Sequence, residues 1–364
     1  MSEERAVESA EEALTPTAPA LMPVEGGPLL GAIGDQPEDF QVDEVPLYET
    51  SGEGEHVWLH VRKRQLNTED VSKRIARAAG VSNRDVGYAG MKDRFAVTTQ
   101  YFSVATKADP SEWDLGDGVE ILAHTRHGNK LRTGHLSANR FRIRLVGVTD
   151  VDALIARAQA LQTNGVLNGY DAQRFGRGGK NLQKATAWAE GIIRRAQPWE
   201  TKMWSSVLQS EVFNRVLQLR ADTQALRVLE GDILRLDGSR SIFTSVDPVV
   251  DQDRLERADV HLTGPMFGPK SPLAQGAAGS IESAAVASLG LSEAAMALVG
   301  KHGSGARRDL VIPLPDLSVE AQGDGSVVAT FTLPSGAYAT NVIRHLLRTP
   351  WSVDGDTRGA ASDA

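Results

Sequence analysis

The chain has 364 residues, of which 41% are hydrophobic and 24% are charged, and it contains no cysteine. This composition is ordinary for a folded protein of about two domains, and it excludes disulfides and cysteine-bound zinc. The formal net charge of -8 argues against a nucleic-acid partner, but the charge is uneven. Residues 1–55 hold one Arg against 14 acidic residues, whereas residues 56–146 hold 16 Lys and Arg against nine, and residues 170–220 hold nine against four. Local basic patches of this kind can bind a polyanion.

Membrane and export signals are missing from the pattern. No apolar run approaches the ~20 residues that a membrane helix needs. The acidic N-terminus lacks the apolar segment of a secretory signal. We therefore expect a cytoplasmic protein without a membrane partner. Residues 1–27 are rich in Glu, Ala and Pro and have no apolar period, which predicts a disordered acidic tail.

The first half of the chain reads as strands with one helix between them. Phe40 and Val42 alternate with polar neighbours, which is typical of a half-buried strand. Asn67 is placed to cap a helix, and Gly80 is placed to end it. The predicted elements are, in order, strands near 40–42 and 57–61, a helix over 67–80, a strand over 97–104 and strand-like segments within 119–146.

The clearest alternation runs from Asn139 to Leu145. Phe141, Ile143 and Leu145 face one way, and three arginines face the other. Two interpretations stay open at this point. The segment is either a sheet edge with a solvated face or a strand at the wall of an anionic groove.

In the second half of the chain the sequence pattern changes, and near the C-terminal end it resembles that of the first half again. Thr149 and Asp152 form a capping-box-like pair before an amphipathic helix that ends at 164–165. Helices, long loops and Gly/Ala-rich stretches follow, until a strand and a helix resume beyond residue 327. This return predicts a discontinuous domain with an insertion. The expected division is a catalytic domain over 28–164 and 306–351, an inserted domain over 165–305 and a flexible tail over 352–364.

One stretch combines a turn, charges and a strand. Gly87 to Gln100 contains a Gly-x-x-Gly turn, then Asp93 between Lys92 and Arg94, then a β-type run. Both cations favour the charged form of the carboxylate, so Asp93 is a candidate nucleophile or charge stabiliser and a poor proton donor. The equally weighted alternative is a solvated charged turn.

Other chemical motifs give little support to competing enzyme classes. Residues 176–181 superficially resemble a phosphate loop, but the full spacing is missing and Asn181 stands where a hydroxyl is needed. His124, His127 and His135 are close in sequence, yet they match no metal-binding motif, so no metal is expected. A serine-hydrolase elbow and a dinucleotide fingerprint are both missing. Aromatic residues at turns can stack bases, although burial in a core is the commoner role.

The stretch from Gly90 to Gln100 resembles the TruD family of RNA pseudouridine synthases. The likeness extends over about 30–350 of the chain, because further blocks match that family in the same order. These blocks are Pro37-Glu38-Asp39-Phe40, Gly52-Glu53-Gly54-Glu55-His56, Asn129-Lys130-Leu131-Arg132, Asn139-Arg140-Phe141, Ala172-Gln173-Arg174-Phe175-Gly176, Ser210 to Arg220, Gly264-Pro265-Met266 and Leu333 to Thr340.

The resemblance implies an α+β pseudouridine-synthase fold, with a curved, mostly antiparallel mixed sheet flanked by helices and an inserted α/β domain. It implies an isomerase of the intramolecular-transferase class that converts uridine to pseudouridine, most often uridine 13 of tRNA, without a cofactor. Asp93 falls on the catalytic aspartate of the family. The residues expected around the substrate are Phe40, Asn139, Phe141, Tyr338, Arg94 and Lys92, and those expected on the RNA backbone are Lys130, Arg132, Arg174 and Arg177.

Three positions depart from the family pattern. Gly34 stands where members often carry a Lys, Tyr338 replaces a Phe of some members, and Asp171 stands where Gly is common. These changes affect substrate positioning and proton transfer more than the reaction. The expected partner is RNA, most often tRNA, and the expected state is a monomer. The alternative is a non-catalytic RNA-binding protein or RNA chaperone on the same scaffold, which would need no carboxylate in a basic cleft.

Overall fold

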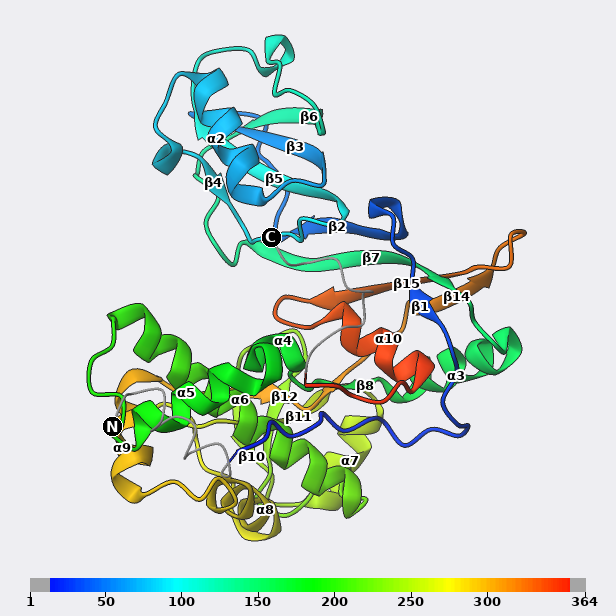
Figure 1. The fold of residues 1–364 in the computed structure, drawn as a ribbon, viewed down its shortest axis with the longest axis vertical. Coiled ribbons are helices and arrows are strands. Elements are labelled where there is room, and N and C mark those ends of the chain that lie inside the picture. The colour runs from blue at the N-terminus through cyan, green and yellow to red at the C-terminus, as the bar shows by residue number, and fades with distance from the viewer. Residues whose placement is uncertain (1–13, 354–364) are drawn as a thin grey trace. The chain divides into compact units, whose positions relative to one another are not determined.

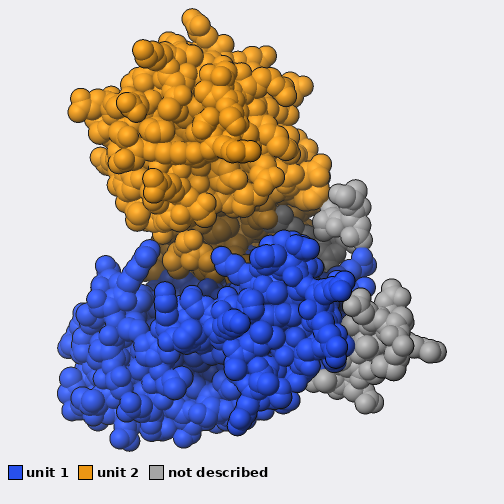
Figure 2. All heavy atoms as spheres, turned by 90° about the vertical axis from the view of Figure 1, so that its left-hand side faces the viewer, with its two compact units in different colours: residues 1–28, 164–313, 340–356 blue, residues 29–163, 314–339, 357–364 orange. Residues whose placement is uncertain are grey.

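The computed structural model describes residues 14–353 (Figure 1). Its contacts divide the chain into two compact units (Figure 2). Unit 2 comprises residues 29–163 and 314–339, and the described part of unit 1 comprises residues 14–28, 164–313 and 340–353. The boundaries expected from the sequence differ from this division at residues 306–313 and 340–351, which group with unit 1.

Unit 2 is built on one large sheet with the strand order β14-β15-β7-β2-β5-β3-β6, to which β1 adds on β7 and β4 on β5 (Figure 1). Its described strand pairs are antiparallel except for β2 with β5. The strands are β1 Ala32–Ile33, β2 Phe40–Pro46, β3 His56–Arg64, β4 Gly87–Tyr88, β5 Val97–Ala105, β6 Val119–His127, β7 Leu136–Val146, β14 Ser318–Ala321 and β15 Val327–Pro334. The predicted strands are therefore confirmed.

Cross-strand register places a continuous set of side chains on one face of this sheet, here called the site face. Val42 of β2 lies opposite Phe141 of β7 and Thr98 of β5. Thr98 in turn lies opposite Lys63 of β3, and Phe141 lies opposite Phe331 of β15. Partners in register share a face, so these residues from five strands form one surface.

The strand β7 lies between β2 and β15, so the expectation of a sheet edge is wrong. Ile143 and Leu145 are fully buried on the site face, as the alternation predicted. Arg140 and Arg142 are exposed on the opposite face, and Arg144 pairs with Asp39 across 3.3 Å. Whether the two exposed arginines line a groove for an anion stays a prediction.

The helix α2 (Thr68–Ala79) packs its apolar side on the β3 and β5 part of the site face. Val71 and Ile75 are fully buried there, in one cluster with Leu59 and Phe102. Gly80 ends the helix with a φ of 68°, a left-handed conformation that glycine adopts without steric cost. The predicted helix is confirmed, although the Asn67 side chain makes no capping hydrogen bond.

The helix α3 (Val151–Asn164) is also confirmed, but its cap differs from the expectation. The carboxylate of Asp150 accepts a hydrogen bond from the amide of Ala153 at 2.9 Å. Thr149 instead accepts one from the amide of Leu30 at 3.2 Å. The neighbouring Asp150 therefore caps the helix.

Unit 1 combines helices with a four-stranded sheet of order β10-β9-β11-β12 and a short β13-β8 pair. The expected inserted α/β domain implies strands here, but the sequence pattern located none of them, and the Gly/Ala-rich stretch from Gln275 to Ser280 lies mostly in helix α8. The elements are β8 Val166–Leu167, α4 Ala172–Phe175, α5 Lys180–Ala189, α6 Pro198–Asp222, β9 Ile233–Leu236, β10 Ile242–Thr244, α7 Pro248–Glu256, β11 Val260–Met266, α8 Gly276–Ala287, α9 Glu293–His302, β12 Ala306–Asp309, β13 Val311–Ile312 and α10 Ala339–Leu347.

Residues 14–27 follow an extended path on unit 1, where a disordered tail was expected. Leu14 and Met22 are buried, and the Thr17 hydroxyl donates a hydrogen bond to the buried carboxylate of Glu211 at 2.7 Å. Residues 1–13 of that tail, and the expected flexible tail from residue 354 onward, lie outside the described residues. Within residues 14–353, no helix has the length and apolar character needed to cross a membrane.

Candidate active site

The candidate catalytic aspartate lies in a loop without regular secondary structure between β4 and β5. We call residues 89–96 the Asp93 loop. Asp93 and Arg94 are exposed, and so are two apolar side chains of the loop, Met91 (61% exposed) and Phe95 (45% exposed). The Arg94 guanidinium lies 5.4 Å from the centre of the Phe95 ring, within the range of a cation–π contact. The loop therefore presents a carboxylate between apolar and cationic groups.

Buried polar side chains hold the backbone of this loop from below. The ammonium of Lys63 donates to the backbone carbonyl of Asp93 at 2.7 Å. The side-chain amide of Gln100 donates to the carbonyl of Gly90 at 3.2 Å, and the Thr68 hydroxyl accepts from the amide of Lys92 at 3.0 Å. Lys63, Gln100 and Thr68 are all fully buried. Hydrogen bonds from buried, packed groups fix the loop more firmly than solvent-exposed ones would.

A buried ion pair forms a further anchor. The ammonium of Lys92 lies 2.5 Å from a carboxylate oxygen of Glu44, and the two side chains are 6% and 1% exposed. The other Glu44 oxygen accepts from the amide of Tyr101 at 3.1 Å. The charge of Lys92, which the sequence placed beside Asp93, is thus matched by Glu44. A contact of Lys92 with substrate stays a prediction.

Lys63 is the cation beneath Asp93. Burial lowers the pKa of Lys63, the negative charge of Asp93 opposes this shift and Lys92 adds a smaller lowering, so that the pKa is about 8. A lysine of ordinary pKa would keep its proton throughout the physiological range. Lys63 is instead close to losing its proton at the upper end of that range.

The residues expected around the base occupy the same region of the site face. Asn139 lies opposite Glu44 on one side and opposite Leu333 on the other. Its side-chain oxygen is buried and has no hydrogen-bond partner among the described residues. Because Glu44 binds Lys92, the neighbour of Asp93, the structure brings Asn139 and the Asp93 loop together. An unpartnered amide oxygen is unusual in a folded protein, and it leaves Asn139 with hydrogen-bonding capacity to offer.

The two predicted base-stacking phenylalanines are largely in the core. Phe40 and Phe141 are 3% and 8% exposed, and their rings meet edge to face with centres 6.0 Å apart. Phe141 also stacks on Phe331 at 5.5 Å. These contacts make a rigid aromatic floor. Direct contact of either ring with a uridine stays a prediction.

Tyr338 follows the strand β15 and precedes α10. The turn between them contains Gly336 at a φ of 84°, which a residue with a side chain rarely adopts. Tyr338 itself is partly exposed. Since Leu333 of β15 lies beside Asn139, the turn with Tyr338 leaves the sheet near the polar end of the site face.

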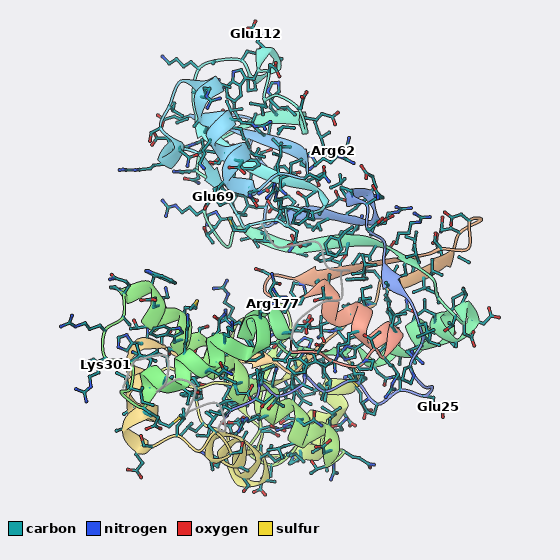
Figure 3. All side chains as sticks on the ribbon, viewed as in Figure 1. Glu25, Arg62, Glu69, Glu112, Arg177 and Lys301 are labelled. Carbon is teal, nitrogen blue, oxygen red and sulfur yellow. The ribbon has the colours of Figure 1, made fainter. Side chains whose placement is uncertain are left out.

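The four residues expected on the RNA backbone differ in their surroundings. Lys130 donates to the carbonyl of Arg84 at 2.5 Å, whereas Arg132 is exposed. Both belong to unit 2. Arg174 and Arg177 belong to unit 1. Arg174 is half-buried and donates to Ser210 at 3.0 Å, and Arg177 is exposed (Figure 3).

Gly34 has a local structural explanation. A Cβ atom placed on Gly34 would overlap the carboxylate of Asp39. That carboxylate accepts from the amide of Gln36 at 3.0 Å and pairs with Arg144, and Asp39 is buried. A lysine at position 34 would displace Asp39 from these contacts. This chain therefore has no basic side chain at position 34 to offer to the site.

Among the described residues, no three His, Asp or Glu side chains converge in a way that could hold a metal ion. The buried polar residues Glu44, Lys63 and Gln100 escaped the sequence patterns altogether. A signal was present, since Glu44 continues the alternation of Phe40 and Val42, and Lys63 continues that of Leu59 and Val61. A charged residue at an expected core position marks either a bulge or a buried functional group.

Comparison with known proteins agrees with this arrangement. The family model described as tRNA pseudouridine synthase D (TruD) matches residues 24–183 and 180–346. The tRNA pseudouridine synthase D of Methylococcus capsulatus is 42% identical over 326 residues, which cover 87% of this chain and 91% of that protein. The protein of the same name from an Anaeromyxobacter species is 39% identical over 341 residues, which cover 92% and 96%.

The fold is shared as well. A solved structure of a putative tRNA pseudouridine synthase D from Methanosarcina mazei matches with a TM-score of 0.74 at 21% identity, over 90% of this chain and 95% of that one. The predicted α+β fold, with a mostly antiparallel mixed sheet and an additional domain, is thereby confirmed. The family match and the two curated relatives span nearly the whole described chain. The chain belongs to the TruD family of pseudouridine synthases.

Proposed function

We propose that the protein is an isomerase that converts a uridine of tRNA to pseudouridine, with uridine 13 as its target and Asp93 as the catalytic group. One observation carries this proposal. Asp93 is an exposed carboxylate whose loop is held by four buried side chains, those of Lys63, Gln100, Thr68 and Glu44. A reactive group fixed in this way meets the demand for precise placement in catalysis. The names of the relatives supply the reaction and the class of RNA.

The chemistry begins with the target base outside the stack. Extruding a uridine from a folded RNA costs a few kcal/mol, least where the base is already unpaired. The Asp93 carboxylate then either attacks the ribose at C1′ or removes the proton at C2′ to give a glycal, and both routes stay open. The glycosidic bond to N1 breaks, the uracil rotates, and a new bond forms from C1′ to C5. As that bond forms, the Asp93–C1′ bond breaks in the first route, and C2′ regains its proton in the second. In both routes the C5 proton leaves and N1 gains one, so atoms balance without a cofactor.

The remaining residues divide into base and backbone contacts. Asn139, Tyr338, Phe40 and Phe141 are assigned to the uracil, because an amide and aromatic rings suit a planar polar base. Tyr338 additionally carries a hydroxyl that can take part in proton transfer from C5. Lys92 and Arg94 would act on the ribose and its phosphate. Lys130, Arg132, Arg174 and Arg177 are assigned to phosphates further along the RNA.

Substituting Asp93→Asn tests the catalytic assignment, because it removes a charge and leaves the shape almost unchanged. We expect pseudouridine formation to be abolished, while the Kd for tRNA changes by less than about twofold. The assay is tritium release from tRNA carrying 5-tritiated uridine, with a separate binding titration. Asp85→Asn is the matched control, since Asp85 is an exposed aspartate in a nearby turn. Turnover by the Asp93→Asn protein would rule out the assignment.

Pseudouridine mapping tests the substrate. RNA from a strain that lacks the protein is compared with RNA from its parent, and we expect pseudouridine to vanish at position 13 of tRNA. An unchanged position 13 with loss elsewhere would reject the target and keep the reaction. If the purified protein bound tRNA and released no tritium, a non-catalytic RNA-binding role would replace it. With tRNA as substrate, we propose that the protein acts in the cytoplasm and as a monomer.

A further inference from the structure

Lys63 is a charged residue in a position that an apolar residue would fill at lower cost. It lies on the site face of β3 opposite Thr98 and is fully buried. Its neighbours Arg62 (labelled in Figure 3) and Arg64 lie on the opposite face. They pair there with Glu120 at 2.9 Å and with Glu38 at 2.7 Å. Burying an ammonium is expensive unless a charge and hydrogen bonds compensate it. Lys63 therefore needs a compensating partner.

The hydrogen bonds of Lys63 do not provide full compensation. An ammonium has three N–H donors, and Lys63 makes one hydrogen bond among the described residues, to the backbone carbonyl of Asp93 at 2.7 Å. A neutral donor would suffice for that bond, as the side-chain amide of Gln100 shows at the carbonyl of Gly90 in the same loop. The negative charge of Asp93 raises the pKa of Lys63 and so favours its protonated form.

The two cations beside Asp93 in the sequence are placed differently from Lys63. Lys92 pairs with Glu44, whose side chain is buried with it. Arg94 is exposed and lies over Phe95, so water screens its charge. Position 34 carries no side chain. By contrast, a charge in the interior acts through a medium of low dielectric constant, where its effect is larger.

We propose that Lys63 is a positioning residue for Asp93, which holds the backbone of the loop and supplies the positive charge that stabilises the carboxylate. This inference rests on the proposed catalytic role of Asp93. The structure of the site then consists of an exposed carboxylate above a buried ammonium, joined through the main chain of Asp93 itself.

The inference has a consequence for the pH dependence of the reaction. Three charged groups of neighbouring elements act on Lys63: Asp93 and Lys92 of the loop directly, and Glu44 of β2 through its pairing with Lys92. The pKa of Lys63 is lowered to about 8. Below this pH the ammonium is charged and supports Asp93, and above it the charge is lost. The rate of the chemical step should therefore fall as pH rises through about 8.

The test measures single-turnover rates with saturating tRNA from about pH 6 to about pH 9, because such profiles report the groups that act in the complex. For Lys63→Met we expect a rate at pH 7 lowered about 10- to 100-fold, and no further fall above pH 8. Binding of tRNA should stay unchanged. Thr68→Val is the matched control, since it removes a neutral anchor of the same loop. Its profile should keep the fall above pH 8, whatever its rate.

Lys63→Arg preserves the charge and serves if the methionine variant does not fold. In this variant the fall in rate should move to a pH well above 8, because arginine keeps its proton there. The inference is overturned if Lys63→Met retains the wild-type fall, if it matches Thr68→Val throughout, or if Lys63→Arg falls at the wild-type pH. An active Asp93→Asn protein would instead defeat the proposed function. If the Asp93→Asn protein is inactive and the Lys63→Met protein is fully active, this inference is rejected and the proposed function stands.

Discussion

The two units bury charge in different ways. In unit 1 the guanidinium of Arg220 and the carboxylate of Asp232 are both fully buried and bond directly to each other. Arg307 and Glu282 form a second buried pair at 2.7 Å. In unit 2 the buried ammonium of Lys63 reaches a backbone carbonyl, and the carboxylate that acts on it belongs to an exposed residue. A buried charge that is matched internally supports the fold, whereas one matched by an exposed partner supports a site.

Breaking the internal pair of unit 1 should have the largest effect on stability. Arg220→Met leaves Asp232 buried without its counter-charge, and we expect the free energy of unfolding to fall by about 3–5 kcal/mol. Urea denaturation of the purified protein measures this. The double variant Arg220→Met with Asp232→Leu should recover most of the loss, because both charges are then gone. A single variant within about 1 kcal/mol of wild type would contradict the structural role.

The Lys92–Glu44 pair lies between these extremes, because it is internal and yet belongs to the Asp93 loop. Glu44→Gln removes the charge and keeps acceptor and shape, so we expect a loss of about 1–3 kcal/mol in the free energy of unfolding together with a lower catalytic rate. The matched control is Glu120→Gln, whose partner Arg62 is half exposed. That exposed pair should contribute less than about 1 kcal/mol. Equal losses of unfolding free energy in Glu44→Gln and Glu120→Gln would show that the buried pair stabilises the fold no more than the exposed pair does.

Lys63→Met should have the smallest effect on stability while it lowers the rate. Its pKa is about 8 in the folded protein against 10.5 ordinarily, so the charged form costs folding free energy below pH 8. At pH 7 we expect the free energy of unfolding of the variant to lie within about 1 kcal/mol of that of wild type, or above it. Between pH 8 and 10.5 the unfolded chain binds the proton more tightly, so wild type gains stability relative to the variant. A destabilised variant would assign Lys63 to the fold.

Local patterns were enough to predict much of unit 2. Alternation located β2, β3, β5 and β7, and Gly80 marked the end of α2. Lys63 and Glu44 were missed because alternation tells only that a residue faces inward. Their partners, Asp93 and Lys92, are distant in sequence, at separations of 30 and 48 residues. Such pairings are properties of the folded sheet and leave no local trace.

Where two adjacent residues could play the same role, the sequence pattern did not identify the one that does. Thr149 and Asp150 can both cap a helix, and the distant amide of Leu30 engages Thr149. In unit 1 the strand β9 is only four residues long, and β11 contains Gly264 and Pro265, residue types that are depleted in strands, so neither was recognised from the sequence. The departure at Gly34 was visible in the sequence. Its cause, the carboxylate of Asp39 in the same space, required coordinates.

The amide of Lys92 belongs to an irregular loop, yet its hydrogen-bond acceptor is the buried hydroxyl of Thr68. Thr68 begins α2 and also bonds to Gln100 of β5 at 2.8 Å. Exchange of this amide with deuterated solvent requires its hydrogen bond to the buried Thr68 to open, and we expect it to be slow for a loop amide. Loops usually open before the elements that they join. Here the Asp93 loop is tied to α2 through Thr68 and to β5 through Gln100, so we expect unfolding of either element to release the loop as well.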